Sequence, residues 1–287
     1  MAEEAQTHPH LPAVLVLAGH DPTGGAGLVA DSEAVAACGG WALTVPTALT
    51  VQNCRDVATV QPVDAVLIRE AAAALEDIEI TAIKVGLLTS EAALDAVVEI
   101  IKRRPGVPVV VDPVLRAGGG HELSTPALVE AFRRRLLPLV DILTPNRREL
   151  ARLAGPDCGD DTERVVELMH LGCQAVLVTG TDEPEARTPA DQVVHTLHVP
   201  DGDRQWRWPR LSGTFHGSGC TLASALASRL AQGESLVVAC EQAQDYTWQT
   251  LAHGWRPGDE NEADDAAGQW LPRRLWRLPV ARFEQGA

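Results

Sequence analysis

A glycine-rich turn near residue 217 carries the residue types that anion chemistry needs. It reads His216-Gly217-Ser218-Gly219-Cys220-Thr221, and the small residues that follow predict a helix from about Gly219 to Ala231. The first N–H groups of a helix lack partners within it, and the helix dipole is positive at that end. Glycines let an anion approach these groups, so the turn is a candidate phosphate site. An ordinary loop at a helix start explains the turn by itself about equally well.

Acidic and amide side chains follow two predicted buried strands. Asp112 ends the valine-rich run 107–111, while Asn146 and Glu149 follow the run 140–143. Open parallel sheets bind ligands at the carboxyl ends of their strands. Because Asn146 and Glu149 are three residues apart, they share one face of the next helix and could serve metal and phosphate. A capping box with asparagine at the N-cap explains that pair equally well.

The first half of the chain offers a second glycine loop and two polar candidates. The loop Gly19–Gly27 lies between a predicted strand and an alanine-rich helix, and Asp31 lies one to two turns into that helix. Its spacing matches neither the dinucleotide fingerprint nor the Walker phosphate loop. Gln52 and Asn53 end the next predicted strand, where turn chemistry is their simpler explanation.

Strand and helix patterns alternate along most of the chain and would position these loops. Predicted strands cover residues 12–18, 41–50, 80–85, 107–113, 140–143 and 175–178, with an antiparallel hairpin at 192–199 and 205–208. Predicted helices cover 27–38, 62–76, 90–103, 125–136, 161–171, 219–231 and 235–253, and another begins after residue 146. This alternation predicts a three-layer α/β domain with a mainly parallel central sheet flanked by helices. We expect a flexible arm (residues 1–11), one domain (12–255) and a C-terminal extension (256–287).

Composition excludes several classes of function. The 287 residues carry a formal net charge of −15, which disfavours binding to nucleic-acid backbones. No apolar run approaches the roughly 20 residues needed to cross a bilayer, so we expect no membrane partner. The six cysteines are widely spaced and form no CxxC pair, which predicts a reduced, cytoplasmic location.

In their order and spacing, the motifs resemble the hydroxymethylpyrimidine and phosphomethylpyrimidine kinases of thiamine biosynthesis, which belong to the ribokinase-like superfamily. The resemblance covers about residues 13–253. It rests on Ala18–Gly27 with Ala30-Asp31, Thr47–Asn53, Lys84–Leu88, Asp112-Pro113-Val114, Thr144-Pro145-Asn146 with Glu149, and His216–Thr221.

The resemblance implies a ribokinase-like fold and ATP-dependent phosphorylation of 4-amino-5-hydroxymethyl-2-methylpyrimidine, often followed by phosphorylation of the monophosphate. It implies a pyrimidine pocket lined by Gly19, Ala26, Asp31, Gln52, Leu87 and Val114. It implies metal ligation by Asp112 and Glu149, nucleotide contacts from Asn146, Thr179 and Gly180, and a catalytic turn of Gly217, Ser218, Gly219 and Cys220. ATP and Mg²⁺ are the expected cofactors, and a homodimer is the expected assembly.

Within this resemblance Cys220 is the candidate base. A thiol at a helix N-terminus can have a lowered pKa, which favours proton acceptance. The alternative is a small buried residue that packs the turn.

Two departures from the family pattern keep other functions open. Thr179-Gly180-Thr181 stands where the family has Lys-Gly-Gly, and Ala117-Gly118-Gly119-Gly120 replaces a lid that contains lysine. Arg116 and His121 are candidate substitutes for these cations. The alternatives are a pyridoxal or pyridoxine kinase, and a catalytically weak pyrimidine-binding regulatory homologue.

Overall fold

The computed structural model describes residues 11–116, 120, 122–180, 189–257 and 268–279. The predicted arm, apart from Leu11, lies outside these residues. So do Gly118, Gly119 and His121 of the predicted lid region and the acidic part of the C-terminal extension.

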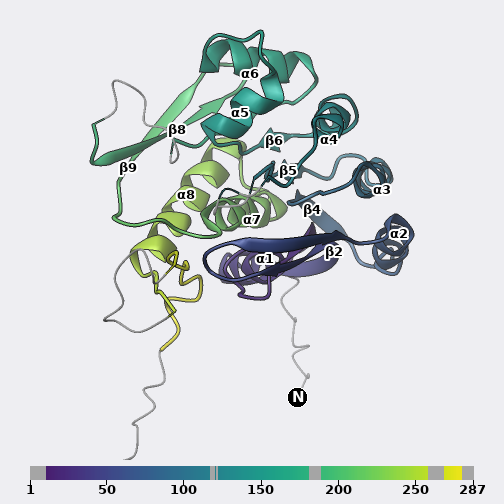
Figure 1. The fold of residues 1–287 in the computed structure, drawn as a ribbon, viewed down its shortest axis with the longest axis horizontal. Helices are drawn as coiled ribbons and strands as arrows, with labels where there is room; N and C mark the ends of the chain where they lie inside the picture. Colours follow the sequence, from purple (N-terminus) through teal and green to yellow (C-terminus); the bar gives the residue numbers. More distant parts are fainter. Residues whose placement is uncertain (1–10, 117–119, 121, 181–188, 258–267, 280–287) are drawn as a thin grey trace, which may run out of the picture.

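Within the described residues, nine strands form one sheet (Figure 1). They are β1 (Ala13–His20), β2 (Trp41–Gln52), β3 (Val57–Pro62), β4 (Ile80–Val85), β5 (Val109–Val111), β6 (Ile142–Leu143), β7 (Val176–Val178), β8 (Gln192–His198) and β9 (Arg204–Pro209). Their order is β3-β2-β1-β4-β5-β6-β7-β8-β9. The six strands from β2 to β7 in this order are parallel, and β3, β8 and β9 pair antiparallel at the two edges. The mainly parallel sheet and its antiparallel hairpin are therefore confirmed.

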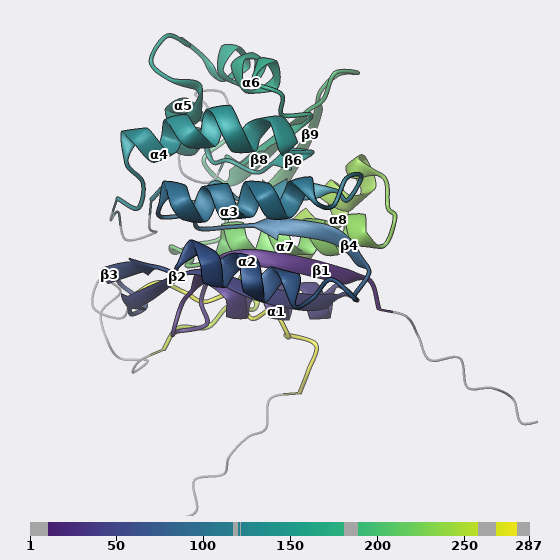
Figure 2. The same cartoon turned by 90° about the vertical axis from the view of Figure 1, so that its right-hand side faces the viewer.

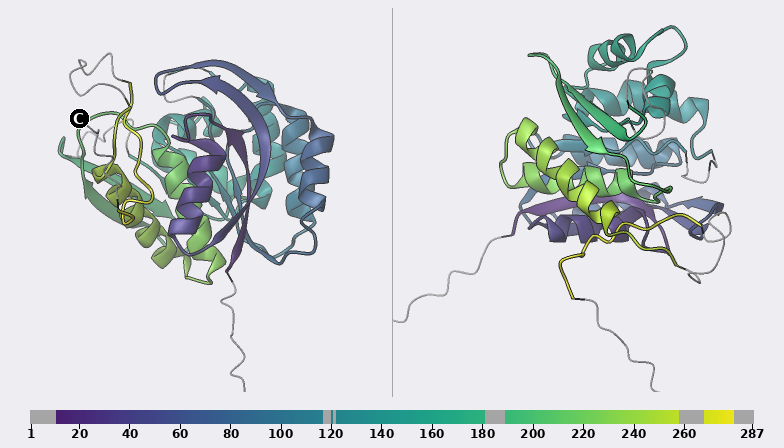
Figure 3. Two further views of the ribbon diagram at one scale, coloured as in Figure 1. Left: turned by 90° about the horizontal axis from the view of Figure 1, so that it is seen from below. Right: turned by 90° about the vertical axis from the view of Figure 1, so that its left-hand side faces the viewer.

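Helices cover both faces of the sheet. The described helices are α1 (Gly27–Ala37), α2 (Ala65–Ala73), α3 (Glu91–Lys102), α4 (Pro126–Ala131), α5 (Arg147–Ala154), α6 (Asp161–His170), α7 (Ser218–Ala231) and α8 (Leu236–Ala252). Helices α2 to α6 pack on one face, and Figure 2 looks onto α2, α3 and α4. Helices α1, α7 and α8 pack on the other, so the purple α1 and the blue helices lie on opposite sides in Figure 3, left. The three-layer prediction is confirmed.

Strand β1 shows why the sequence folds this way. Its side chains alternate between the two apolar cores, with Leu15 and Leu17 on one face and Val14 and Val16 on the other. All four are fully buried, which is the pattern of a strand at the centre of a parallel sheet. Strand β1 therefore lies at the centre of the sheet, between the two apolar cores.

One strand was not predicted, and two sequence expectations about element bounds were wrong. Strand β3 was not predicted, because as an edge strand it is mostly exposed and lacks a buried apolar run. The expected strand 107–113 pairs only over Val109–Val111. The expected helix 125–136 is α-helical only to Ala131, after which one π-helical turn (Phe132–Leu136) and a short 3₁₀ turn (Leu137–Leu139) lead into β6.

The described part of the C-terminal extension packs against the domain. Figure 3, right, shows this yellow segment beside the end of α8. Isolated β-bridges pair Phe215 with Trp270 and Trp255 with Leu271. Among the described helices, none is long and apolar enough to span a membrane.

Candidate active site

A cavity of about 210 Å³ opens at the carboxyl ends of the parallel strands. Its walls come from the ends of β1, β2 and β4, from the loops after β5 and β6, and from the first residues of α7. Of the predicted site residues, it gathers Gly19, Ala26, Gln52, Leu87, Asp112, Val114, Asn146, Glu149, Gly217, Ser218, Gly219 and Cys220. The structure therefore brings together residues that are up to about 200 positions apart in the sequence.

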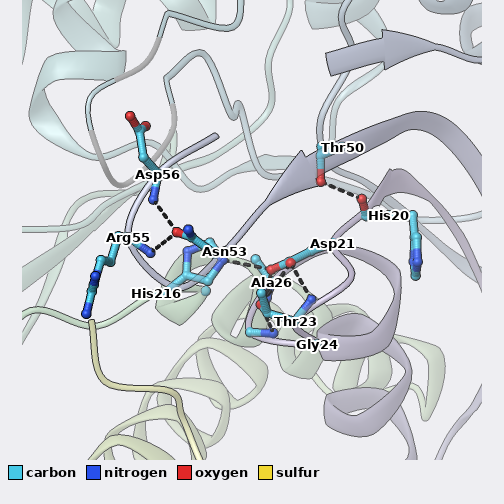
Figure 4. A network of polar contacts seen from close by, with 12 residues as sticks. His20, Asp21, Thr23, Gly24, Ala26, Thr50, Asn53, Arg55, Asp56 and His216 are labelled. Atoms are coloured by element: carbon cyan, nitrogen blue, oxygen red, sulfur yellow. Dashed lines mark hydrogen bonds and ion pairs between the residues drawn. The ribbon is translucent and has the colours of Figure 1, made fainter. Parts of the chain in front are cut away.

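Gln52 and its neighbour have different roles. Gln52 lines the cavity, whereas the Asn53 side chain accepts hydrogen bonds from Arg55 N at 2.8 Å and Asp56 N at 3.0 Å (Figure 4). Turn chemistry explains Asn53, and Gln52 keeps its amide at the cavity wall.

Asp31 does not line the cavity, so its expected contact with the pyrimidine stays a prediction. It is fully buried where α1 meets β4 and α7, and its Oδ1 accepts from Lys84 Nζ at 2.8 Å and from Ser224 Oγ at 2.7 Å. Burial alone would lower the pKa of Lys84, but the charges of Asp31 and Asp112 and the hydrogen bond to Asp31 raise it above its usual value. Lys84 is thus a buried cation at the wall of the cavity, and Asp31 holds it there.

Asn146 and Glu149 form the capping box that was one of their two explanations. Asn146 Oδ1 accepts from Glu149 N, and Glu149 Oε2 accepts from Asn146 N, both at 2.9 Å. Both residues also line the cavity. The cap fixes the two side chains at the cavity wall, so it is compatible with contacts to a ligand.

The Cys220 thiol is not the acidic thiol that its place at a helix start predicts. Burial and the nearby charge of Asp112 raise the pKa of Cys220 far above its usual value, although Lys84 opposes this. Burial also raises the pKa of Asp112, while Lys84 and a hydrogen bond from the Cys220 thiol counteract that rise. The expectation of a lowered pKa is therefore wrong, because burial and a carboxylate outweigh the helix end.

A loop carboxylate that the sequence analysis gave no role organises the two glycine turns. Asp21 Oδ2 lies 2.7 Å from His216 Nε2 and accepts from Ala26 N at 2.9 Å (Figure 4). Its Oδ1 accepts from the backbone N and Oγ1 of Thr23, both at 2.8 Å. Burial would raise the pKa of Asp21, but these hydrogen bonds and His216 lower it below its usual value. An aspartate directly after a buried strand was the sequence signal for this role.

A second cavity of about 130 Å³ adjoins the first at the start of α7. Phe215, Ser218 and Gly219 line both cavities. The other walls come from β8, β9 and α8 and include two tryptophans, Trp208 and Trp248. Thr179 lines this second cavity rather than the first.

Gly180 lines neither cavity. A Cβ added there would lie 2.3 Å from the carbonyl oxygen of Val194, so glycine is needed for the close approach of two strands. The expected nucleotide contact of Gly180 remains a prediction.

A hydrogen-bonded group fixes one wall of the second cavity. Gln244 Nε2 donates to Cys240 O at 2.9 Å, and Gln244 Oε1 accepts from Trp208 Nε1 at 3.2 Å. His195 Nδ1 lies 3.1 Å from the same oxygen and therefore carries the proton. Burial lowers the pKa of His195 to about 4, although the hydrogen bond to Gln244 opposes this. The imidazole is thus neutral at neutral pH.

This buried imidazole makes stability depend on pH. The unfolded chain binds a proton at His195 below about pH 6.5, whereas the folded protein does so only near pH 4. The stability that the neutral His195 imidazole allows is therefore fully present above about pH 6.5. As the pH falls toward 4, the free energy of unfolding decreases by up to about 3 kcal/mol. We expect denaturant unfolding to show a smaller loss over this range for His195→Gln than for the wild type. Equal losses in the two proteins would contradict this.

Comparisons with known proteins agree with this geometry. A family model described as phosphomethylpyrimidine kinase matches residues 21–264. The hydroxymethylpyrimidine/phosphomethylpyrimidine kinase of Streptomyces coelicolor is 35% identical over 254 residues, which cover 86% of this chain and 91% of the relative. The crystal structure of phosphomethylpyrimidine kinase from Clostridium difficile 630 superposes with a TM-score of 0.71 at 28% identity, covering 84% and 99% of the two chains. An ADP complex of Bacillus subtilis pyridoxal kinase superposes with a TM-score of 0.80 at 24% identity, covering 94% and 100%, and bears on the fold alone.

Proposed function

Since the chain belongs to the phosphomethylpyrimidine kinase family, we propose that it transfers the γ-phosphoryl group of ATP to the hydroxymethyl group of 4-amino-5-hydroxymethyl-2-methylpyrimidine. The family match supports a pyrimidine as the substrate. The two adjoining cavities support phosphoryl transfer from a nucleotide to that substrate. The monophosphate of the same pyrimidine is the proposed second substrate, as the name of the Streptomyces relative indicates.

The single observation that carries the mechanism is that two cavities meet at one anion-binding turn. Ser218 and Gly219 line both, and they belong to the first turn of α7, where N–H groups lack helical partners. We assign the larger cavity to the pyrimidine and the cavity with Trp208 and Trp248 to the nucleotide. The phosphoryl group then passes between them over the turn.

The turn stabilises charge and the walls align the reactants. Phosphoryl transfer depends chiefly on alignment and on stabilisation of the phosphoryl oxygens. We assign this role to the amides from Gly217 to Cys220, which would donate to these oxygens in the manner of an oxyanion hole. Gln52 offers a donor and an acceptor to the polar edge of the pyrimidine, while Leu87 and Val114 cover its apolar surface.

The donor set of the first cavity fits Mg²⁺. Asp112 Oδ2 is buried without a hydrogen-bond partner among the described residues, and Asp112, Asn146 and Glu149 all line the cavity. The described residues contain no group of three or more histidine, cysteine or acidic side chains that could hold a metal ion. That agrees with an ion held by one or two carboxylates, water and substrate phosphates. When bound, Mg²⁺ would neutralise charge on those phosphates.

The substrate proton has a route through the thiol. The raised pKa of Cys220 means that its sulfur carries a proton in the resting site and donates it to Asp112. We propose that Cys220 accepts the hydroxyl proton as its own proton moves to the Asp112 carboxylate.

Product analysis tests the function. Purified protein with ATP and Mg²⁺ should convert the hydroxymethylpyrimidine to its monophosphate, followed by mass spectrometry, and Asp112→Asn should abolish the conversion. Absence of product above the level of Asp112→Asn would contradict the proposal. Parallel reactions with the pyrimidine monophosphate and with pyridoxal separate a second phosphorylation and a pyridoxal kinase from the main activity. Tight pyrimidine binding without turnover would instead indicate the regulatory homologue.

The protonation state of Cys220 gives a separate prediction. Because the thiolate is the nucleophile in alkylation, we expect iodoacetamide at neutral pH to modify Cys220 more slowly than Cys158, although both are partly accessible. Peptide mass spectrometry over a time course measures this order. Faster labelling of Cys220 would show that its pKa is lowered and that it can act as a base directly.

A further inference from the structure

The C-terminal segment 268–279 brings a buried arginine to the anion-binding turn. Trp270 N donates to Thr214 O, and His216 N donates to Trp270 O, both at 2.9 Å. These bonds attach the segment to the residues that lead into α7. Four residues later, Arg274 is only 3% exposed.

The Arg274 guanidinium binds both glycine loops of the site. Its Nε donates to Thr221 Oγ1 at 2.8 Å, in the first turn of α7. Its Nη1 donates to Gly24 O at 3.1 Å and its Nη2 donates to Gly25 O, in the loop before α1. Nη1 also lies 3.2 Å from Glu33 Oε2. One rigid side chain therefore joins the loop to the helix start.

The contact extends to the turn itself. Thr221 Oγ1, which accepts from Arg274, donates to Gly217 O at 2.8 Å. A Cβ on Gly217 would lie 3.0 Å from Arg274 Nη2 and 1.9 Å from Gly25 O. Because Gly217 has no side chain, the backbone of Gly25 and the Arg274 guanidinium can both lie next to it.

The charge of Arg274 also suits this position. The acids Asp112 and Glu149 line the first cavity together with Lys84 and Arg116. Lys84 is paired with Asp31 at 2.8 Å, and Arg116 Nε donates to Gly120 O. The carboxylate of Glu33 beside Arg274 is partly exposed, so water screens it more than the buried guanidinium. Arg274 therefore places positive charge behind amides that must bind a phosphoryl group.

We propose that Arg274 is a positioning residue for phosphoryl transfer, which clamps the loop at residues 24–25 against the first turn of α7 and adds positive charge behind the Gly217–Cys220 turn. Its guanidinium does not reach the reacting atoms. The clamp follows from the contacts themselves, and only the kinetic test rests on the proposed function.

Hydrogen exchange tests the clamp without any activity. Arg274→Lys keeps the charge but cannot hold Thr221, Gly24 and Gly25 together, because an ammonium lacks the planar fork. We expect faster amide exchange at residues 24–26 and 217–221 in Arg274→Lys, with unchanged exchange in β1 and β4. Arg273→Ala is the matched control, because Arg273 is more exposed than Arg274 and its Nη2 donates only to Leu278 O among the described residues. Equal exchange in Arg274→Lys and Arg273→Ala would overturn the clamp.

Steady-state kinetics test its effect on the reaction. We expect Arg274→Lys to lower kcat by about tenfold to a hundredfold, with KM for the pyrimidine changed much less, because misplaced amides weaken transition-state binding. Arg274→Met, which also loses the charge, should lose more. Binding of ADP with aluminium fluoride should weaken in parallel with kcat, while binding of ADP alone should not.

A kcat for Arg274→Lys equal to that of Arg273→Ala, or a loss of kcat explained wholly by the fraction of unfolded protein, would overturn the proposal. Wild-type protein without turnover would refute the proposed function and leave the exchange experiment to decide the clamp.

Discussion

Gly217→Ala is expected to lower kcat for phosphoryl transfer by about a hundredfold or more. Gly217 has φ of +83°, and a Cβ there would lie 1.9 Å from Gly25 O. No side-chain rotation relieves this contact, because the backbone fixes the position of a Cβ and the Gly25 oxygen is itself a backbone atom. The first turn of α7 and the loop before α1 must therefore move apart, which misaligns the amides that bind the phosphoryl group.

Gly233→Ala separates this effect from backbone strain. Gly233 has φ of +81°, but nothing lies within 4 Å of the position that a Cβ would take there. Its replacement should cost about 1–2 kcal/mol of folding free energy and leave kcat unchanged. Kinetics at saturating substrate and denaturant unfolding of both variants make the comparison. Similar kcat values for the two variants would refute the steric explanation.

Lys84→Met is expected to destabilise the fold by about 3–5 kcal/mol, the largest stability effect among the proposed changes. Lys84 and Asp31 are both fully buried and lie 2.8 Å apart. Removal of the cation leaves the carboxylate with the hydroxyl of Ser224 as its remaining hydrogen-bond partner among the described residues. An uncompensated buried charge is costly, since neither water nor a counter-ion reaches it.

A double-mutant cycle makes this prediction specific. Asp31→Leu/Lys84→Met removes both charges, so it should recover most of the lost stability, and urea unfolding of the four proteins measures the coupling. Arg69→Met is the control, because the Arg69–Glu99 pair joins α2 and α3 on the surface and is screened by water. A double variant as unstable as the sum of its single variants would show that the pair is not coupled.

Much of the fold could be predicted because the pattern of apolar residues that marks a buried strand or helix lies within one short segment of the sequence. Val109–Val111 and the alternating face pattern of β1 are apolar runs whose burial follows from composition and spacing. The edge strand β3 was missed for the same reason, since an edge strand needs few buried residues and leaves little pattern. The resemblance then placed Gln52, Leu87 and Val114 together, and they do line one cavity.

The sequence by itself determined the family, the three-layer α/β architecture and the glycine turn at the start of α7, because motif order and periodicity are properties of neighbouring residues. Only the tertiary structure decided what surrounds the chemical groups. Asp21 lies 195 positions from His216, and Arg274 lies about 250 positions from Gly24 and Gly25. The direction of the Cys220 pKa shift depends on burial and on charges from distant strands and helices, and so does the pairing of Asp31 with Lys84. Such contacts leave no local pattern, because folding rather than spacing along the chain brings the groups together.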